Sequence, residues 1–216
     1  MNDLSITQEF LLCSLNDKGK LPSFTSERLV GFLASGLLEL QLENCINIEE
    51  KKVIVKSDLP TDLDYLQPLF HYIKQASPVK ISKVVGAYNF SITDKHLKQL
   101  VNSVGDSLAK ANTVVIKNDK SGSKYVPNKS SINKIIDKIR AEIFEDELIT
   151  QDVTILVILL NKSGLLKDYF SKHEQIEIKE KLNELNKTES ANLVQGMINK
   201  VEGISALLQA PIFPRK

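Results

Sequence analysis

The sequence predicts a mainly α-helical fold: a helical bundle around a central apolar helix, with two short β-hairpins at about residues 46–55 and 113–126. Two observations lead to this fold class. Apolar residues recur at helical spacing through most of the chain, and two short apolar runs each surround a polar turn. The chain has 216 residues, of which 42% are hydrophobic, enough to bury one core. Because no long linker divides it, we expect residues 1–216 to form a single domain.

Several stretches have their apolar residues on one helix face. The first, at about Thr7–Leu15, begins with a capping box of Ser5 and Gln8 and ends at the turn-forming residues 16–19. The others lie at residues 29–40, 97–108, 132–143 and 193–204. The run Val153–Leu160 is apolar on every side and fits either a buried strand or a core helix. Its helical neighbours favour a helix at the centre of the bundle.

Two segments have the pattern of β-hairpins. Residues 46–55 contain two short apolar strands around a charged turn. Residues 113–126 contain a second pair of strands around a polar turn with Gly122. Pro127 follows the second strand of this pair, which favours an edge rather than the centre of a sheet.

Composition excludes several classes of protein. Lys and Arg total 28 against 27 Asp and Glu, so the net charge of +1 does not favour binding to a polyanion by bulk charge. The two cysteines have no metal or disulfide spacing and fit a reducing compartment. The first residues lack the pattern of a signal peptide, and the longest apolar run is shorter than the roughly 20 residues that span a membrane. We therefore expect a cytoplasmic protein.

No residue pattern points to catalysis, a cofactor or a metal site, so we do not expect an enzyme. The histidines are scattered without metal-ligand spacing, at His71, His96 and His173. His71 is expected at the surface, whereas Cys13 and Cys45 are expected to be inert thiols in the core. The carboxylates of Glu142–Glu147 have the pattern of a solvated face.

Positive charge is concentrated in one segment. From Lys110 to Arg140 there are eight basic and two acidic residues, a local net charge of +6. Lysines near an anionic bilayer contribute about 1 kcal/mol each, so a few in one plane would give weak, salt-sensitive adhesion. The alternative interpretation is a solvated helix face and a hairpin edge that lysines protect from uncontrolled pairing.

Three stretches resemble the Golgi phosphoprotein 3-like family in their order and spacing. They are LLCSLNDKG at Leu11–Gly19, LLELQL at Leu37–Leu42 and KVIVKSDLPT at Lys52–Thr61. The Lys-Ser-Asp-x-Pro-Thr piece of the third stretch is the most specific. Ser107–Lys110 and Ile158–Leu160 also resemble the family, so the similarity covers almost the whole chain, which looks like a compact, prokaryotic-type member.

The resemblance implies a helical fold with an exposed hairpin used for self-association. It also implies a peripheral protein of the cytosolic membrane leaflet that binds the headgroup of phosphatidylinositol 4-phosphate. The family's headgroup pocket uses one tryptophan and three arginines. By alignment Phe24 stands at the tryptophan, and the arginine positions are Leu33, Asn102 and Gly105. The bidentate donors that suit a phosphate are therefore absent at these positions.

We expect seven residues to contact lipid. Phe24 would be a shallow apolar anchor, although it also fits simple packing at the start of a helix. Arg28, one turn from Phe24, and Lys98, one turn before Asn102, would replace the absent arginines as weaker donors. The membrane contact itself would come from the lysines of the second hairpin, Lys117, Lys120 and Lys124. The expected partners are thus an anionic phospholipid headgroup and a membrane surface.

Two alternative functions remain open on the sequence. The first is a scaffold that forms a homo-oligomer through the hairpin at 113–126, with Tyr125 and Val126 as the strand edge. The second is a winged helix, with the hairpin at 46–55 as the wing and residues 29–42 as the reading helix. That helix has no arginine or asparagine placed to meet base edges, so no nucleic acid is expected as a partner.

Overall fold

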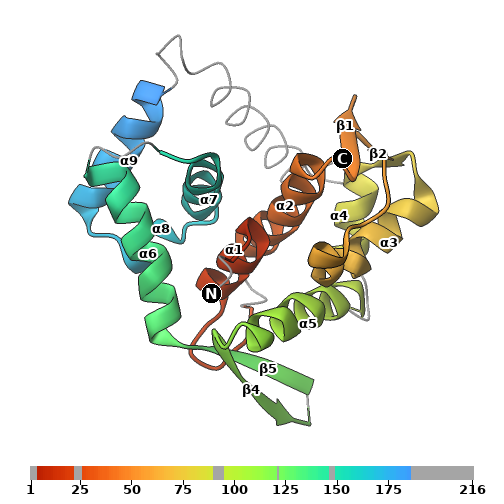
Figure 1. The fold of residues 1–216 in the computed structure, drawn as a ribbon, viewed down its shortest axis with the longest axis horizontal. Coiled ribbons are helices and arrows are strands. Elements are labelled where there is room, and N and C mark those ends of the chain that lie inside the picture. The colour runs from red at the N-terminus through yellow and green to blue at the C-terminus, as the bar shows by residue number, and fades with distance from the viewer. Residues whose placement is uncertain (1–3, 22–25, 90–94, 121, 146–148, 186–216) are drawn as a thin grey trace, which may run out of the picture.

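The computed structural model describes residues 4–21, 26–89, 95–120, 122–145 and 149–185 (Figure 1). The helices are α1 (Ile6–Ser14), α2 (Ser26–Leu42), η1 (a 3₁₀ helix, Thr61–Leu66), α3 (Gln67–Ala76), α4 (Ile81–Asn89), α5 (Lys95–Lys110), α6 (Lys129–Phe144), α7 (Gln151–Lys162), α8 (Leu166–Tyr169) and α9 (Lys172–Leu185). The strands are β1 (Ile46–Glu49), β2 (Lys52–Val55), β3 (Val79–Lys80), β4 (Val114–Asp119) and β5 (Gly122–Pro127). The predicted fold class, mainly helical with short hairpins, is confirmed.

Three buried helices form the centre of the molecule. α2 is buried at every position from Leu29 to Leu40, and α7 at every position from Val153 to Leu160. α1 packs against both of them, and in Figure 1 α1 and α2 run between α3–α5 on one side and α6–α9 on the other. The prediction of a core helix at Val153–Leu160 is confirmed, although this helix shares the centre with α1 and α2.

Helix α1 begins as its sequence predicts. The Gln8 N–H donates to Ser5 Oγ at 3.4 Å, and the Ser5 N–H donates to Gln8 Oε1 at 3.0 Å. These two bonds form the capping box and satisfy backbone donors that a helix start would otherwise leave without partners. After α1 ends, the Asn16 side chain accepts the N–H groups of Lys18 and Lys20 and closes a tight loop.

The first hairpin is confirmed and belongs to a larger sheet. β1 pairs with β2, as predicted, and the short strand β3 adds to β2 with Val53 opposite Val79. The specific stretch of the family resemblance, Lys52–Thr61, supplies β2 and the connector after it. Within this connector the Lys56 N–H donates to the Cys45 carbonyl at 2.9 Å, and Asp58 forms an ion pair with Lys74 of α3 at 2.5 Å. The first contact joins the connector to the start of the sheet, and the second, between two exposed side chains, joins it to α3.

The acidic stretch between α6 and α7 differs from its prediction. Glu142 is 7% exposed, and its Oε2 accepts the Thr150 N–H at 2.7 Å and the Thr150 Oγ1–H at 2.8 Å. Thr150 in turn caps α7 by accepting from the Val153 N–H. The prediction of a solvated face is therefore wrong for Glu142, because its carboxylate is needed to fix the start of the buried helix α7.

At the end of the lysine-rich segment, Arg140 of α6 forms contacts that join this helix to α9. Arg140 Nε lies 2.8 Å from Glu174 Oε1, and its guanidinium stands over the Phe170 ring. Hydrogen bonding from Arg140 lowers the pKa of Glu174 from 4.5 to about 2. This arginine is thus paired with carboxylates, although its side chain is 39% exposed.

The sequence pattern did not predict every helix. α3, α4 and α9 are helices that were not predicted, and in α3 the buried residues are Leu69, Phe70 and Ile73. The predicted helix at residues 193–204 lies outside the described residues. Within the described part of the chain, no helix combines the length and the apolar character needed to cross a bilayer.

Candidate functional site

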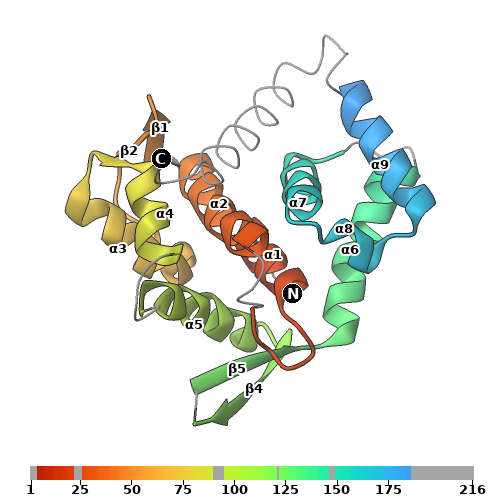
Figure 2. The ribbon, with the colours of Figure 1, turned by 180° about the vertical axis from the view of Figure 1, so that it is seen from behind.

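The second hairpin projects from the bundle below α5, as both views show (Figures 1 and 2). Side chains alternate between the two faces of a strand, and Tyr125, which is 1% exposed, fixes which face meets the bundle. Lys117 lies opposite Lys124, and Val115 opposite Val126, on the other face. The outward face therefore carries a basic pair beside an apolar pair.

This outward face is only partly neutralised. Lys117 and Lys124 stand directly opposite each other, an arrangement that destabilises a hairpin through charge repulsion. Asp119 on the same face forms an ion pair with Lys124. Lys117 and the exposed Lys120 of the turn form no ion pair with a described residue. The hairpin thus keeps excess positive charge toward solvent.

Two exposed apolar residues of β4 were missed by the sequence prediction. Val115 is 52% exposed and Ile116 is 42% exposed. An alternating pattern would have suggested that one of two successive strand residues is buried, but β4 extends past the bundle, so neither face is fully covered. These side chains add apolar surface next to the hairpin lysines.

The free edge of the hairpin is β4 rather than β5. The Tyr125 N–H donates to the Gly19 carbonyl at 3.1 Å, so the loop after α1 covers the edge of β5 at this point. Because Ile116 is the partner of Tyr125, its own N–H and C=O point to the opposite edge of the hairpin. The expectation that Tyr125 and Val126 offer the strand edge is therefore corrected to β4.

Tyr125 locks the hairpin to α5. Its hydroxyl donates to Asp106 Oδ1 at 2.8 Å and lies 3.2 Å from the Asn102 carbonyl oxygen. Its ring lies so close to Gly105 that a Cβ built there would be 2.6 Å from the ring carbons. Burial, followed by the interaction with Asp106, raises the pKa of Tyr125, so the phenol remains a neutral donor.

This packing closes one of the two positions on α5 where the family resemblance would put an arginine. Gly105 lies under the Tyr125 ring, and Leu33 is fully buried within α2. Asn102 is exposed and lines a cavity of about 690 Å³ between α3 and α5, together with His71 and His96. The described residues that line this cavity include no lysine or arginine. Packing therefore fills the positions of Gly105 and Leu33, whereas Asn102 borders an open cavity that has no basic side chain among its described lining residues.

The other predicted contact residues lie apart. Phe24 is outside the described residues. Arg28, in the first turn of α2, donates to Asp168 of α8 at 2.7 Å, and its side chain is mostly buried. Lys98 is exposed on the first half of α5. The contacts of the described residues do not join Arg28 to Lys98 or Asn102, so these residues do not form one cluster.

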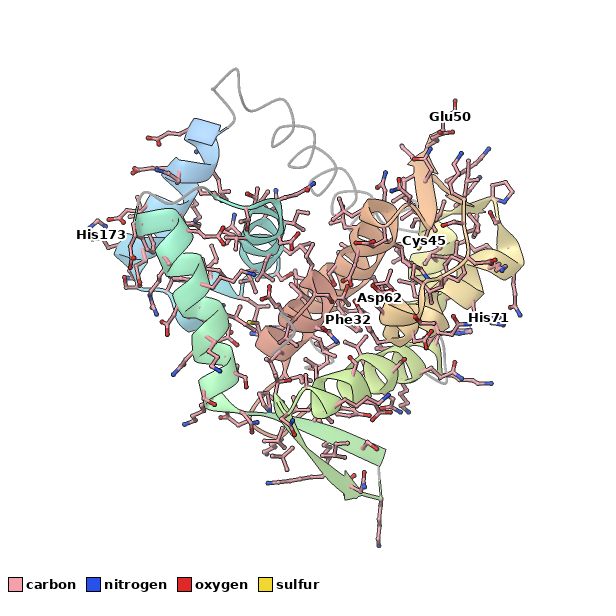
Figure 3. All side chains as sticks on the ribbon, viewed as in Figure 1. Phe32, Cys45, Glu50, Asp62, His71 and His173 are labelled. Carbon is pink, nitrogen blue, oxygen red and sulfur yellow. The ribbon has the colours of Figure 1, made fainter. Side chains whose placement is uncertain are left out.

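The remaining candidate residues are histidines and cysteines, which lie at the surface or in the core. His71 and His173 are exposed on opposite sides of the molecule (Figure 3), and Cys13 and Cys45 are buried free thiols, as predicted. Burial raises the pKa of both thiols. Among the described residues, no group of three histidine, cysteine or carboxylate side chains is arranged to hold a metal ion.

The surroundings of α2 bear on the winged-helix alternative. A reading helix must present one face to a groove, but α2 is buried on all sides between Leu29 and Leu40. The hairpin β1–β2 follows this helix, as the alternative requires, but it packs into a sheet with β3. The geometry of these elements weighs against DNA reading by α2.

The comparison with known families agrees with the stretches that carry the resemblance. The chain matches the family model described as Golgi phosphoprotein 3 (GPP34) over residues 6–203. This range includes the three stretches at 11–19, 37–42 and 52–61. The comparison with curated proteins found no match. Because the family match spans most of its length, the chain belongs to the Golgi phosphoprotein 3 (GPP34) family.

Proposed function

We propose that the protein is a peripheral membrane protein that binds anionic phospholipids through the outward face of the hairpin β4–β5. The observation that carries this proposal is the pairing of Lys117 with Lys124 beside Val115 and Val126 on a face turned away from the bundle. Lysines at this position meet phosphate and carboxylate groups of a bilayer, while the valines reach its interfacial region. Membership of the Golgi phosphoprotein 3 family supports the same role.

The expected adhesion is weak and depends on charge. Each lysine near an anionic surface contributes about 1 kcal/mol, so three lysines give roughly a hundredfold preference for anionic over neutral vesicles. The ion pair of Lys124 with Asp119 reduces this figure. Screening at high salt removes most of the attraction, because Lys117 and Lys120 are exposed and Lys124 is partly exposed. The hairpin therefore accounts for membrane attachment but does not select a headgroup.

Reversing the hairpin charge tests the proposal. We expect the variant K117E/K120E/K124E to lose at least about tenfold in flotation with phosphatidylcholine vesicles that contain phosphatidylserine, because attraction becomes repulsion. Wild-type binding should fall as the salt is raised from about 50 to about 500 mM, because the Debye length then shortens from about 14 to about 4 Å. Flotation of wild type with purely neutral vesicles should be low at both salts.

A matched control separates local charge from net charge. The variant K167E/K172E/K179E makes the same charge change on exposed lysines of α8 and α9, which lie on the far side of the molecule from the hairpin (Figure 1). It should keep most of the wild-type binding. Equal loss in both variants would mean that binding follows net charge, and the hairpin would then have no special role.

The open edge of β4 favours a second function, self-association. The main-chain groups of Ile116 point away from β5, and Val115 and Ile116 are exposed, so a strand from a second copy has donors, acceptors and apolar surface to meet. Pairing would also multiply weak membrane contacts. This candidate is compatible with lipid binding.

Proline at the free edge tests self-association. Ile116→Pro removes an N–H that the hairpin itself does not use, so we expect a smaller particle by light scattering while the fold is retained. Ile116→Thr keeps that N–H and is the control, which should retain most of the association. If both variants and wild type have the mass of one chain at micromolar concentration, the edge does not mediate self-association.

A further inference from the structure

A second basic feature lies behind the hairpin, in a cavity of about 740 Å³. It is bordered by α1, by the end of α5 and by one face of α6. Its charged lining residues are Lys110, Lys134, Lys138 and Glu9. The volume is within the range of about 300–1,000 Å³ that is typical of small-ligand sites. Concave basic surfaces focus the electrostatic potential more than the projecting hairpin does.

The positive charge of this cavity is largely uncompensated. Lys134 and Lys138 are one turn apart on α6, where two like charges destabilise a helix. Of the described lining residues, Glu9 carries the one carboxylate; it is 4% exposed and lies 3.4 Å from the ammonium of Lys138. Lys110 and Lys134 form no ion pair with a described residue. Two positive charges therefore remain for a ligand.

The cavity also holds neutral donors. Ser131 lies in the first turn of α6, at the positive end of that helix, and neither its hydroxyl nor the Asn112 amide bonds to a described residue. The hydroxyls of Ser107 and Thr113 are already committed, because they donate to the carbonyls of Val104 and Leu108. The free neutral donors of the cavity thus lie on both sides, Asn112 after the end of α5 and Ser131 on α6.

A neighbouring acidic cavity influences where an anion would bind. Lys110 also borders a second cavity, whose carboxylates are Glu39, Glu43, Asp62, Asp64, Asp106 and Asp152. An anion is repelled from that side and attracted to Lys134 and Lys138. The carbonyls of Ser107, Leu108 and Ala109 at the end of α5 accept backbone N–H groups, so they are not left as free acceptors facing the ligand.

We propose that this cavity binds the dianion of a phosphate monoester between Lys110, Lys134 and Lys138, with Ser131 and Asn112 as neutral donors. Lysine binds phosphate as a point charge, and the two positive charges that remain beside the Lys138–Glu9 pair match a compact dianion better than the single charge of a carboxylate. The phosphate belongs either to a soluble metabolite or to a lipid headgroup. The site is separate from the hairpin face and does not depend on the function proposed for it.

The first test uses the full chain in solution without vesicles. Titration of the ¹⁵N-labelled protein with glycerol 3-phosphate is expected to shift the amide signals of residues 110–112 and 131–138 and to saturate. The variant K110Q/K134Q should weaken this binding at least about tenfold, because two charge-assisted contacts are lost. Lys138 is left intact because it pairs with buried Glu9. An unchanged melting temperature establishes that the variant is folded.

Two results would overturn the site. One is a titration that does not saturate or whose shifts spread over all exposed lysines. The other is equal weakening by K117Q/K120Q, a control that removes the same charge from the hairpin. Either would mean general ion screening rather than a built site.

Vesicles then identify the source of the phosphate. Phosphatidylcholine vesicles with phosphatidylinositol 4-phosphate are compared with phosphatidylserine vesicles of equal surface charge. A preference for the phosphomonoester lipid that K110Q/K134Q abolishes supports a lipid headgroup. Soluble binding without such a preference supports a metabolite. Loss of all vesicle binding in the hairpin variant, with glycerol 3-phosphate binding retained, would separate this site from the membrane-contact face.

Discussion

Gly19→Ala is expected to lower the free energy of unfolding by about 2–5 kcal/mol and to loosen the hairpin from the bundle. Gly19 has φ of +70°, where an L-residue costs about 1–2 kcal/mol. A Cβ at this position would also lie 2.7–2.8 Å from backbone atoms of Tyr125 and Val126. Those atoms belong to a paired strand and cannot move alone, so overpacking adds about 1–3 kcal/mol. Urea denaturation measures the total.

Gly164→Ala is the matched control. Gly164 has φ of +67°, almost the same as Gly19, but a Cβ there would have no atom within 4 Å. Its substitution should cost only the backbone strain of about 1–2 kcal/mol. The difference between the two variants isolates the contact with β5. Equal costs would mean that the loop after α1 does not hold the hairpin.

Hydrogen exchange gives a local readout of the same contact. The Tyr125 N–H donates to the Gly19 carbonyl, so in Gly19→Ala this amide should exchange faster relative to the core amides of α7. In Gly164→Ala it should keep its protection relative to that core. The test therefore separates a general loss of stability from local release of β5.

The contact at Gly19 illustrates what the sequence could predict. The stretch Leu11–Gly19 predicts a helix and its end because both signals are local: apolar spacing, then turn-forming residues. That its glycine approaches β5, more than a hundred residues later, is a tertiary contact without a local signal. The hairpin pattern itself was also readable, but which of its edges remains free depended on this contact.

The candidate binding sites, too, could be predicted only in part from the sequence. The excess of lysine between Lys110 and Arg140 is visible in the sequence, and the projecting hairpin contains part of it. The sequence does not separate lysines that face outward from those that line a cavity, because this depends on how α6 lies against α1 and α5. Arg140 belongs to neither group, since it pairs with Glu174.

At Asn102 and Gly105 the sequence shows that arginine is absent, but only the packing shows what lies beside these residues. Their side chains predict the absence of arginine donors, but not what occupies the space. Tyr125 supplies the answer, because its ring covers Gly105 and its hydroxyl bonds to Asp106. The sequence therefore shows which donor is absent at Gly105, but the contact that fills this position comes from β5 and has no local signal on α5.

The second large effect is expected at Glu39, which joins three elements of the core. It is 6% exposed on α2, and its Oε2 accepts the Thr7 N–H in the first turn of α1 at 2.9 Å. Its Oε1 accepts the hydroxyl of Tyr65 in η1. Burial, with Glu39 as the next cause, raises the pKa of Tyr65, so the phenol stays a donor. The carboxylate thus extends the cap that Ser5 begins, and the negative charge suits a helix start.

Glu39→Ala should lower the free energy of unfolding by about 2–4 kcal/mol, because the Thr7 N–H and the Tyr65 hydroxyl both lose their acceptor. Glu39→Gln is the matched control and should cost only about 1 kcal/mol, since its amide oxygen still accepts from Thr7 and its NH₂ donates to Tyr65. Combining Glu39→Ala with Tyr65→Phe should cost less than the sum of the two single variants, because they remove one shared bond. Denaturant titrations of the four proteins measure this coupling. Additive effects, or a cost for Glu39→Ala no greater than that for Glu39→Gln, would show that the cavity beside Glu39 supplies water that replaces the carboxylate.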